Sequence, residues 1–268
     1  MPSTALRVCI LGHSGVGKSP VAKLFDVPGW EPFRVRDKPR NAEDAKVCKS
    51  KTEFAALQEA HKELVPLHPG PNSLKVYEDW TFFQIRGKDW QCLEHTADAK
   101  NPDKSLRIEI FAPVLLDLCK NHEKINKAFV LDPAHLVFII LNPTLDRFAD
   151  MTEPSTALRQ ATLFAATERD RAQGKTPDLA DGLKRTHHLS TELTAWRGLL
   201  TEYQASAVEC LGWPHFEFRY HDAAGVSHAR NELIRARATI LDAAGNLRNR
   251  LEPHLKTQEQ IVQLTDIV

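Results

Sequence analysis

Apolar residues gather in short continuous runs along the chain, a pattern typical of strands that are buried on both faces of a parallel sheet. The first run, ALRVCIL at 5–11, includes the β-branched residues Val8 and Ile10. The strongest later run is HLVFIILNPT at 135–144, whose apolar centre LVFIIL is far too short to span a bilayer. Both runs predict buried strands.

Alternating and helical patterns predict the remaining elements. Alternation with aromatic residues on both sides predicts a hairpin from LKVYEDWTFFQI and DWQCLEHTA, joined through Arg86, Gly87 and Lys88. Other predicted elements are helices at 52–64 (with Thr52 as N-cap), 183–211 and 226–241, a strand or turn leading into a helix at 106–125, a helix or a helix followed by a strand at 156–172, and a strand at 215–222. Because strands and helices alternate, we predict an α/β fold with a mainly parallel sheet.

The length of 268 residues suits one decorated domain or two small ones. The segment VPLHPGPNS at 65–73 breaks any regular element, and no internal repeat or low-complexity tract stands out. We therefore expect one domain over 1–245 with insertions at 26–73 and 172–212, followed by a helical tail at 246–268.

Charge and cysteine content narrow the expected partners and location. Lys and Arg together number 35, as do Asp and Glu, so no overall field favours nucleic acid or an acidic membrane. The five cysteines are scattered without a CxxC pair, which indicates neither a zinc knuckle nor a disulfide framework. The chain enters its first strand almost at once, leaving no room for a signal peptide. We expect a cytoplasmic protein without a membrane span.

The stretch LGHSGVGKSPVA at 11–22 carries the clearest chemistry. It matches G-x-x-x-x-G-K-[ST], in which backbone N–H groups cradle phosphates, the lysine reaches the β- and γ-phosphates and the hydroxyl binds Mg²⁺. A predicted strand precedes the motif and a helical pattern follows it, as the motif requires. The residues expected to bind the nucleotide are Gly12, His13, Ser14, Gly15, Val16, Gly17, Lys18, Ser19 and Pro20. Lys18 is also expected to act in catalysis, and Ser19 to bind the metal.

The order of elements after this loop resembles the Ras-like and translation-factor class of P-loop GTPases, which have a three-layer α/β fold. In that family the second strand of the hairpin ends in Asp-x-x-Gly, which holds Mg²⁺ through water. The matching residues here are Glu94-His95-Thr96-Ala97, followed by Asp98. The resemblance implies that Glu94 and Ser73 serve the metal and that His95 or Asp98 orients the attacking water.

The same resemblance suggests where a guanine base would bind. The nearest match to the guanine-reading [NT]-K-x-D motif is Thr167-Glu168-Arg169-Asp170, in which Thr167 and Asp170 keep the base-contacting positions. Ala223 and Ala224 stand where the family presents backbone N–H groups to the base. The chain departs from the family at Glu94, Ala97 and Glu168, where the family has Asp, Gly and Lys.

Three functions follow from these patterns. The first is Mg²⁺-dependent binding and slow hydrolysis of a nucleoside triphosphate, with GTP and GDP as expected ligands, ATP left open, and a protein partner or activator. The second is a nucleoside monophosphate kinase resembling guanylate kinase, with RVRDKPRNAED at 34–44 as the phosphate grip. In that case the cations of the lid would be Arg169, Arg171, Lys184 and Arg185. The third is a nucleotide-binding scaffold with little turnover.

Overall fold

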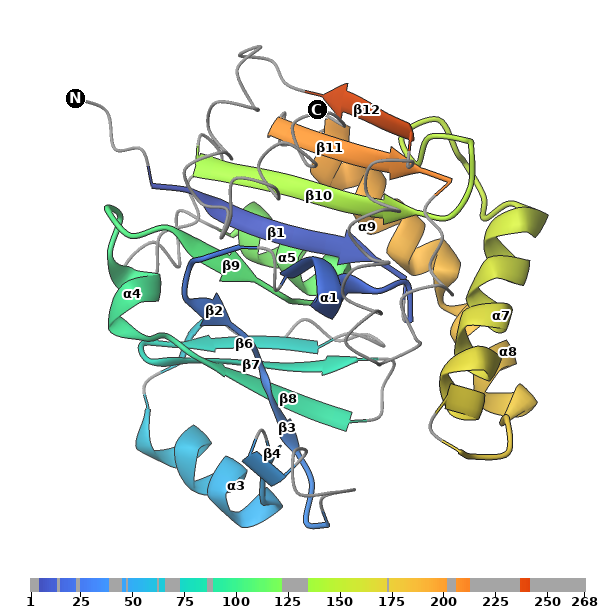
Figure 1. Ribbon diagram of the computed structural model, residues 1–268. Coiled ribbons are helices and arrows are strands. Elements are labelled where there is room, and N and C mark those ends of the chain that lie inside the picture. The colour runs from blue at the N-terminus through green and yellow to red at the C-terminus, as the bar shows by residue number, and fades with distance from the viewer. Residues whose placement is uncertain are drawn as a thin grey trace.

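Two β-sheets that share a hydrophobic core organise the chain, as the computed structural model shows (Figure 1). The structure describes residues 5–13, 15–22, 25–38, 45–46, 48–61, 63–65, 73–85, 89–121, 135–172, 174–201, 206–212 and 237–241. Predicted features that lie outside the described residues are Ser14, Ala223, Ala224, the hairpin turn at 86–88, the strand at 215–222 and the tail at 246–268.

The first sheet has six strands in the order β12-β11-β10-β1-β9-β2. Their bounds are β1 Arg7–Gly12, β2 Gly29–Trp30, β9 Leu106–Ile108, β10 Leu136–Asn142, β11 Ser206–Leu211 and β12 Arg237–Leu241. Neighbouring strands are parallel except for β12, which pairs antiparallel with β11. β1 and β10 are buried along nearly their whole length, which is why each reads as a continuous apolar run. The predicted α/β class with a mainly parallel sheet is confirmed.

The second sheet is mixed and has the order β4-β3-β8-β7-β6-β5. Its strands are β3 Phe33–Val35, β4 Cys48–Lys49, β5 Glu63–Val65, β6 Ser73–Tyr77, β7 Trp80–Ile85 and β8 Asp89–Glu94. The predicted hairpin exists as the antiparallel pair β7–β8, although its first half is divided into β6 and β7. This hairpin lies in the second sheet, whereas the neighbours of β1 in the first sheet are β9 and β10. The predicted insertion at 26–73 covers only the first part of this second sheet.

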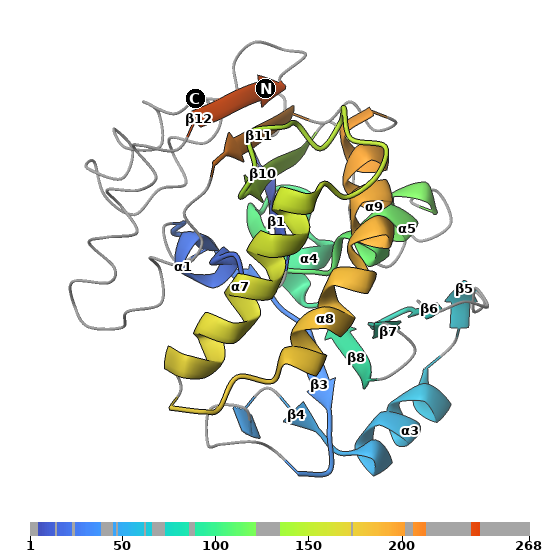
Figure 2. The same ribbon diagram turned by 90° about the vertical axis from the view of Figure 1, so that its right-hand side faces the viewer.

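The helices are α1 Lys18–Ala22, α3 Lys51–Ala60, α4 Ala97–Lys100, α5 Ala112–Lys120, α7 Thr156–Ala172, α8 Leu179–His187 and α9 Leu189–Thr201. In Figures 1 and 2, α1 lies on one face of the first sheet, α5 and α9 cover the other, and α7 and α8 stand beside the ends of the strands. None of the described helices is both long enough and apolar enough to cross a membrane.

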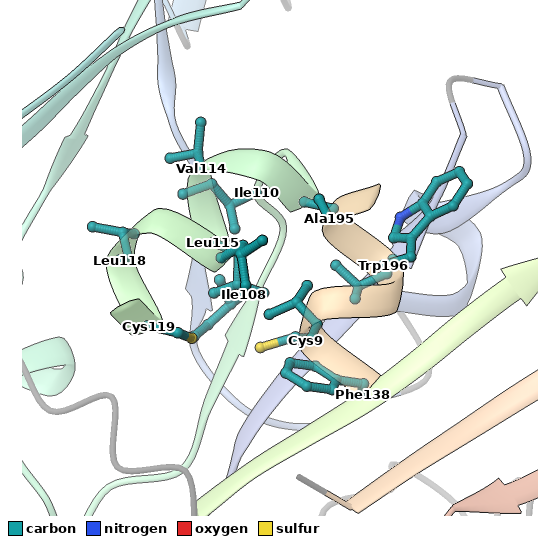
Figure 3. Packing of buried hydrophobic residues seen from close by; sticks show 14 of the residues in the cluster. Cys9, Ile108, Ile110, Val114, Leu115, Leu118, Cys119, Phe138, Ala195 and Trp196 are labelled. Atoms are coloured by element: carbon teal, nitrogen blue, oxygen red, sulfur yellow. The ribbon is translucent and has the colours of Figure 1, made fainter. Parts of the chain in front are cut away.

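The core forms where α5 and α9 pack on the first sheet (Figure 3). Cys9, Ile108 and Phe138 point from β1, β9 and β10 toward these helices. The Trp196 ring of α9 stacks on Phe148, with ring centroids 4.3 Å apart. The second sheet contributes to the same core through Leu74, Val76, Phe83 and Leu93, while its other face packs on α3 through Phe54, Tyr77, Phe82 and Cys92. Residues on the two faces alternate along these strands, as expected for a sheet buried on both sides.

Several predicted elements differ from those observed. The range 183–211, predicted to be mostly helical, contains the end of α8 and the whole of α9, but it ends in β11, a strand of the first sheet. The end of the predicted helix at 226–241 is the strand β12. The segment 156–172 is a single helix, α7. The N-cap of α3 is Ser50 rather than Thr52, because the acid three residues after Ser50, Glu53, completes a capping box with it.

Candidate functional site

The loop between β1 and α1 is shaped by glycines in backbone conformations that other residues rarely adopt. Gly12, Gly15 and Gly17 have φ angles of 141°, 92° and 94°. A Cβ atom on Gly12 would lie 2.7 Å from Val16 Cγ1 and 2.9 Å from the carbonyl oxygen of Leu141. The loop therefore turns tightly against the carboxyl end of β10, in a path that a larger residue at position 12 would block.

Lys18 folds back onto this loop. Its Nζ donates hydrogen bonds to the carbonyl oxygens of Gly12, at 2.7 Å, and His13, at 2.9 Å. His13 itself is fully buried, while Ser19, the next residue of α1, is exposed. The structure thus holds the ammonium group against the inside of the loop and leaves the Ser19 hydroxyl at the surface.

Glu109, which the sequence analysis did not single out, lies opposite Ser19. The residue follows β9, the strand that runs parallel to β1, and the Ser19 hydroxyl donates to Glu109 Oε2 at 3.4 Å. Burial raises the pKa of the Glu109 carboxyl to about 7; the charge of Glu31 adds to this shift, and those of Arg107 and Lys18 oppose it. The parallel sheet thus places the carboxyl group of Glu109 beside the hydroxyl of Ser19, the last residue of the G-x-x-x-x-G-K-[ST] motif.

Arg107 adjoins the same acid. Arg107 and Glu109 are two residues apart and share the face of the sheet opposite to the core residues Leu106 and Ile108. Arg107 Nε lies 3.2 Å from Glu109 Oε1, while Nη2 donates to Glu31 Oε1 at 2.8 Å. The Nε contact is an ion pair rather than a directed hydrogen bond, because no acceptor among the described residues meets the hydrogen-bond geometry at Nε. The site therefore contains two carboxylates around one guanidinium.

The carboxyl end of β10, beside the loop, is fixed by a fully buried acid on β11. Glu209 Oε1 accepts hydrogen bonds from Asn142 Nδ2 and from the backbone N–H of Phe148, both at 2.7 Å. Burial raises the pKa of this carboxyl, and the two hydrogen bonds oppose the shift. Asn142 also accepts from the backbone and hydroxyl of Thr144. This network ties Asn142 and Phe148 to β11 next to the loop.

Asp98, one of the residues expected to orient water, lies at the other end of β1. Arg7, the first residue of β1, donates to the carbonyl oxygens of Ala99 and Asn101, so α4 with Asp98 packs at this end. The glycine-rich loop follows Gly12, the last residue, and the five residue steps from Arg7 to Gly12 separate the two ends by about 17 Å. Glu94 ends β8 and is exposed, and its carbonyl accepts from Trp30 Nε1 at 2.6 Å. We therefore do not assign Glu94, His95 or Asp98 to the loop.

His95 is instead a buried structural side chain. Its Nδ1 lies 3.1 Å from the carbonyl oxygen of Glu78, which can only accept, so Nδ1 carries the proton. Its Nε2, 2.7 Å from Thr81 Oγ1, then accepts from the threonine hydroxyl. Burial lowers the pKa of His95 to about 4, with the carbonyl of Glu78 opposing the shift. The ring is neutral at physiological pH and joins the turn before β7 to the end of β8.

The other predicted site residues are also placed in regular elements. Ser73 is the first residue of β6 and pairs with Gln84 in the second sheet. Thr167 and Asp170 lie in α7, where the Thr167 hydroxyl donates to the carbonyl of Phe164 and Asp170 Oδ2 accepts from the N–H of Asp178. Both are buried, so the structure does not present them as base-reading groups at the end of a strand.

α7 does approach the loop, but not through the predicted motif. A Cβ on Gly15 would lie 3.3 Å from Ala165 Cβ, so this helix packs directly on the loop. Two of the four expected lid cations have carboxylate partners on their own helices: Arg171 pairs with Glu168 and Arg185 with Asp181. These pairs partly neutralise the charges that the kinase interpretation requires.

Comparisons with known proteins do not add a family to this picture. A scan against protein-family models and a search of curated protein sequences found no match for the chain. The functional argument therefore depends on the geometry of the loop, Ser19 and Glu109.

Proposed function

We propose that the chain is a P-loop nucleoside triphosphatase that binds a Mg²⁺–nucleotide complex on the loop 12–19 and hydrolyses it slowly. The observation that carries the proposal is the approach of Ser19 Oγ to Glu109 Oε2, 3.4 Å, from two neighbouring parallel strands. In P-loop proteins the motif serine and an acid from another strand serve the same cation. The present arrangement fits that chemistry with Glu109 in place of the acid expected at position 94.

The donor atoms suit magnesium. Mg²⁺ prefers oxygen ligands and is commonly held by one or two carboxylates together with phosphate oxygens and water. Among the described residues no group of three or more His, Cys, Asp and Glu side chains could enclose a metal. Ser19 and Glu109 would thus hold the ion jointly with a nucleotide. When bound, it would neutralise charge on the transferred phosphoryl group.

The lysine supplies the second part of the argument. Lys18 now bonds to the carbonyls of Gly12 and His13, which are neutral acceptors. A phosphate is a stronger, charged acceptor, so an entering triphosphate would compete for the ammonium group. Arg107 is held by Glu31 and Glu109 rather than offered to a phosphate, so we expect slow turnover unless a partner supplies a further cation. We assign no preference for a nucleotide base, because Asp170, the residue expected to bind guanine, accepts a hydrogen bond from the N–H of Asp178 at the start of α8.

Calorimetric titration of the protein with GTP, GDP, ATP and GMP, each with and without Mg²⁺, tests this proposal. We expect one triphosphate to bind in the micromolar range or tighter, with Mg²⁺ strengthening binding and free phosphate released on incubation. Absence of binding by any triphosphate contradicts the proposal. Transfer of phosphate to added GMP would favour the kinase alternative, and tight binding without release of phosphate would favour a scaffold.

A further inference from the structure

The Arg107 guanidinium is fixed from several directions. Besides its contacts with Glu31 and Glu109, its Nη1 donates to the carbonyl oxygen of Ala22, at 3.0 Å, which is the last residue of α1. Gly29 leaves room for this group, because a Cβ there would lie 2.6 Å from Nη2. The Arg107 side chain is 15% exposed. The guanidinium therefore occupies a built slot between α1, β2 and β9.

The two oxygens of the Glu109 carboxylate have different neighbours. Oε1 lies beside Arg107 Nε, 3.2 Å away, and Oε2 faces Ser19 Oγ, 3.4 Å away. A carboxylate on a flexible side chain has several rotamers. Because Arg107 attracts one of its oxygens, the rotamer that turns the other oxygen toward Ser19 is favoured.

We infer that Arg107 is a positioning residue for the cation site, an inference that rests on the proposed function. It orients Glu109 toward the cation through the Oε1 contact, and Glu31 and the carbonyl of Ala22 keep the guanidinium in place. Groups that orient metal ligands without touching the metal strongly affect metal affinity, and their loss commonly weakens binding by about 10- to 100-fold.

Two possible effects of Arg107, repulsion of the cation and orientation of Glu109, predict opposite changes in Mg²⁺ affinity when Arg107 is replaced. A guanidinium near a cation site repels the cation, so removing its charge tightens Mg²⁺ binding if charge is all that matters. If Arg107 positions Glu109, its removal weakens Mg²⁺ binding despite the lost repulsion. A lysine at this position keeps the charge but lacks the planar fork that reaches three partners.

The experiment compares wild type, R107Q and R107K with a fluorescent analogue of whichever triphosphate the wild type binds. The affinity of each protein for this analogue is measured in EDTA and across a Mg²⁺ titration. R159Q is the matched control, because Arg159 is a half-buried arginine of α7 whose Nε donates to the carbonyl oxygen of Pro154. We expect the Mg²⁺ concentration at half effect to rise about tenfold in R107Q and R107K and to stay unchanged in R159Q, with similar affinity in EDTA throughout.

A lower Mg²⁺ half-point in R107Q, or an unchanged one in R107K, overturns the inference while leaving the proposed function intact. Loss of nucleotide binding in EDTA in both Arg107 variants also overturns it, because Arg107 would then shape the loop itself. If the wild type binds no triphosphate, it is the proposed function that fails.

Discussion

Ser19 and Glu109, separated by 90 positions in the chain, place a hydroxyl and a carboxylate oxygen 3.4 Å apart. Two parallel strands make this possible, since β1 and β9 end at the same edge of the sheet and their chains continue there into α1 and Glu109. The contact joins the motif that is most evident in the sequence to a residue that the sequence conceals.

Lys18→Ala should abolish triphosphate binding. The ammonium group is the only side-chain charge that the motif directs at the β- and γ-phosphates, and alanine cannot replace it. Calorimetry with the triphosphate that binds wild type best measures the loss. Lys120→Ala, which changes an exposed lysine at the end of α5, serves as control and should bind normally. Retained micromolar affinity in Lys18→Ala would count against the whole scheme.

Glu109→Gln should retain nucleotide binding in EDTA but lose the strengthening by Mg²⁺. Hydrolysis should fall about 100-fold, because a few kcal/mol of metal-dependent charge stabilisation are lost. Release of free phosphate over time gives the rate. Glu94→Gln is the matched control, since the resemblance to GTPases places the same role at that exposed residue. If Glu94→Gln is the slow variant and Glu109→Gln is normal, the assignment made from the structure is wrong.

Acid should destabilise the protein through His95. Its native pKa of about 4 is below the usual value of 6.5, so between these values the unfolded chain binds more protons. The stability from neutral His95 is therefore present above pH 6.5 and is lost as the pH falls toward 4, by up to about 3 kcal/mol. Urea unfolding of wild type and His95→Asn at several pH values measures the difference.

In His95→Asn the decline between pH 6.5 and 4 should be shallower, and nucleotide affinity should equal that of wild type at neutral pH. An equally steep decline in the variant would show that other groups dominate acid unfolding. Loss of nucleotide binding in a folded variant would instead restore His95 to the site.

Gly12→Ala should lower both stability and nucleotide affinity. The new methyl group would meet Val16 and the backbone of Leu141, in addition to the strain of a φ angle of 141°. We expect a loss of about 1–3 kcal/mol in the free energy of unfolding. Gly174→Ala measures the cost of a positive φ angle alone. Gly174 has a φ of 66°, and a Cβ there would meet no atom of the described residues within 4 Å. Equal losses in the two variants would exclude the steric contribution at position 12.

Local patterns predicted the main buried strands and the position of the glycine-rich loop. The apolar runs predicted β1 and β10 because strands covered on both faces leave continuous apolar sequence. The spacing of Gly12, Gly17, Lys18 and Ser19 located the loop because its path depends on residue types that can be read directly. The pairing of Trp80–Ile85 with Asp89–Glu94 was likewise visible, because alternation and a short turn are local features.

Long-range placement was not visible in the same way. β9 has only three residues, too few for a period, so Glu109 carried no pattern stronger than an acid after a short apolar run. The longer hairpin, β7–β8, lies in the second sheet, and it is the short β9 that pairs with β1. Thr167 and Asp170 match the guanine-reading motif by residue type, yet they lie within the continuous helix α7. Which strands pair and which helix residues are buried depend on tertiary packing, and the spacing of apolar residues along the chain does not reveal it.

The hydrogen bond from Trp30 Nε1 to the carbonyl oxygen of Glu94 spans 64 positions and joins β2 of the first sheet to the end of β8 in the second. Trp30 lies in β2, which pairs with β9. Along the chain, only residues 95–105 separate Glu94 from the start of β9. Once the second sheet has formed, β2 and β9 meet across a short connection, and the entropy lost in closing the loop falls accordingly. The second sheet thus shortens the loop that must be closed before Glu109, which follows β9, can reach Ser19.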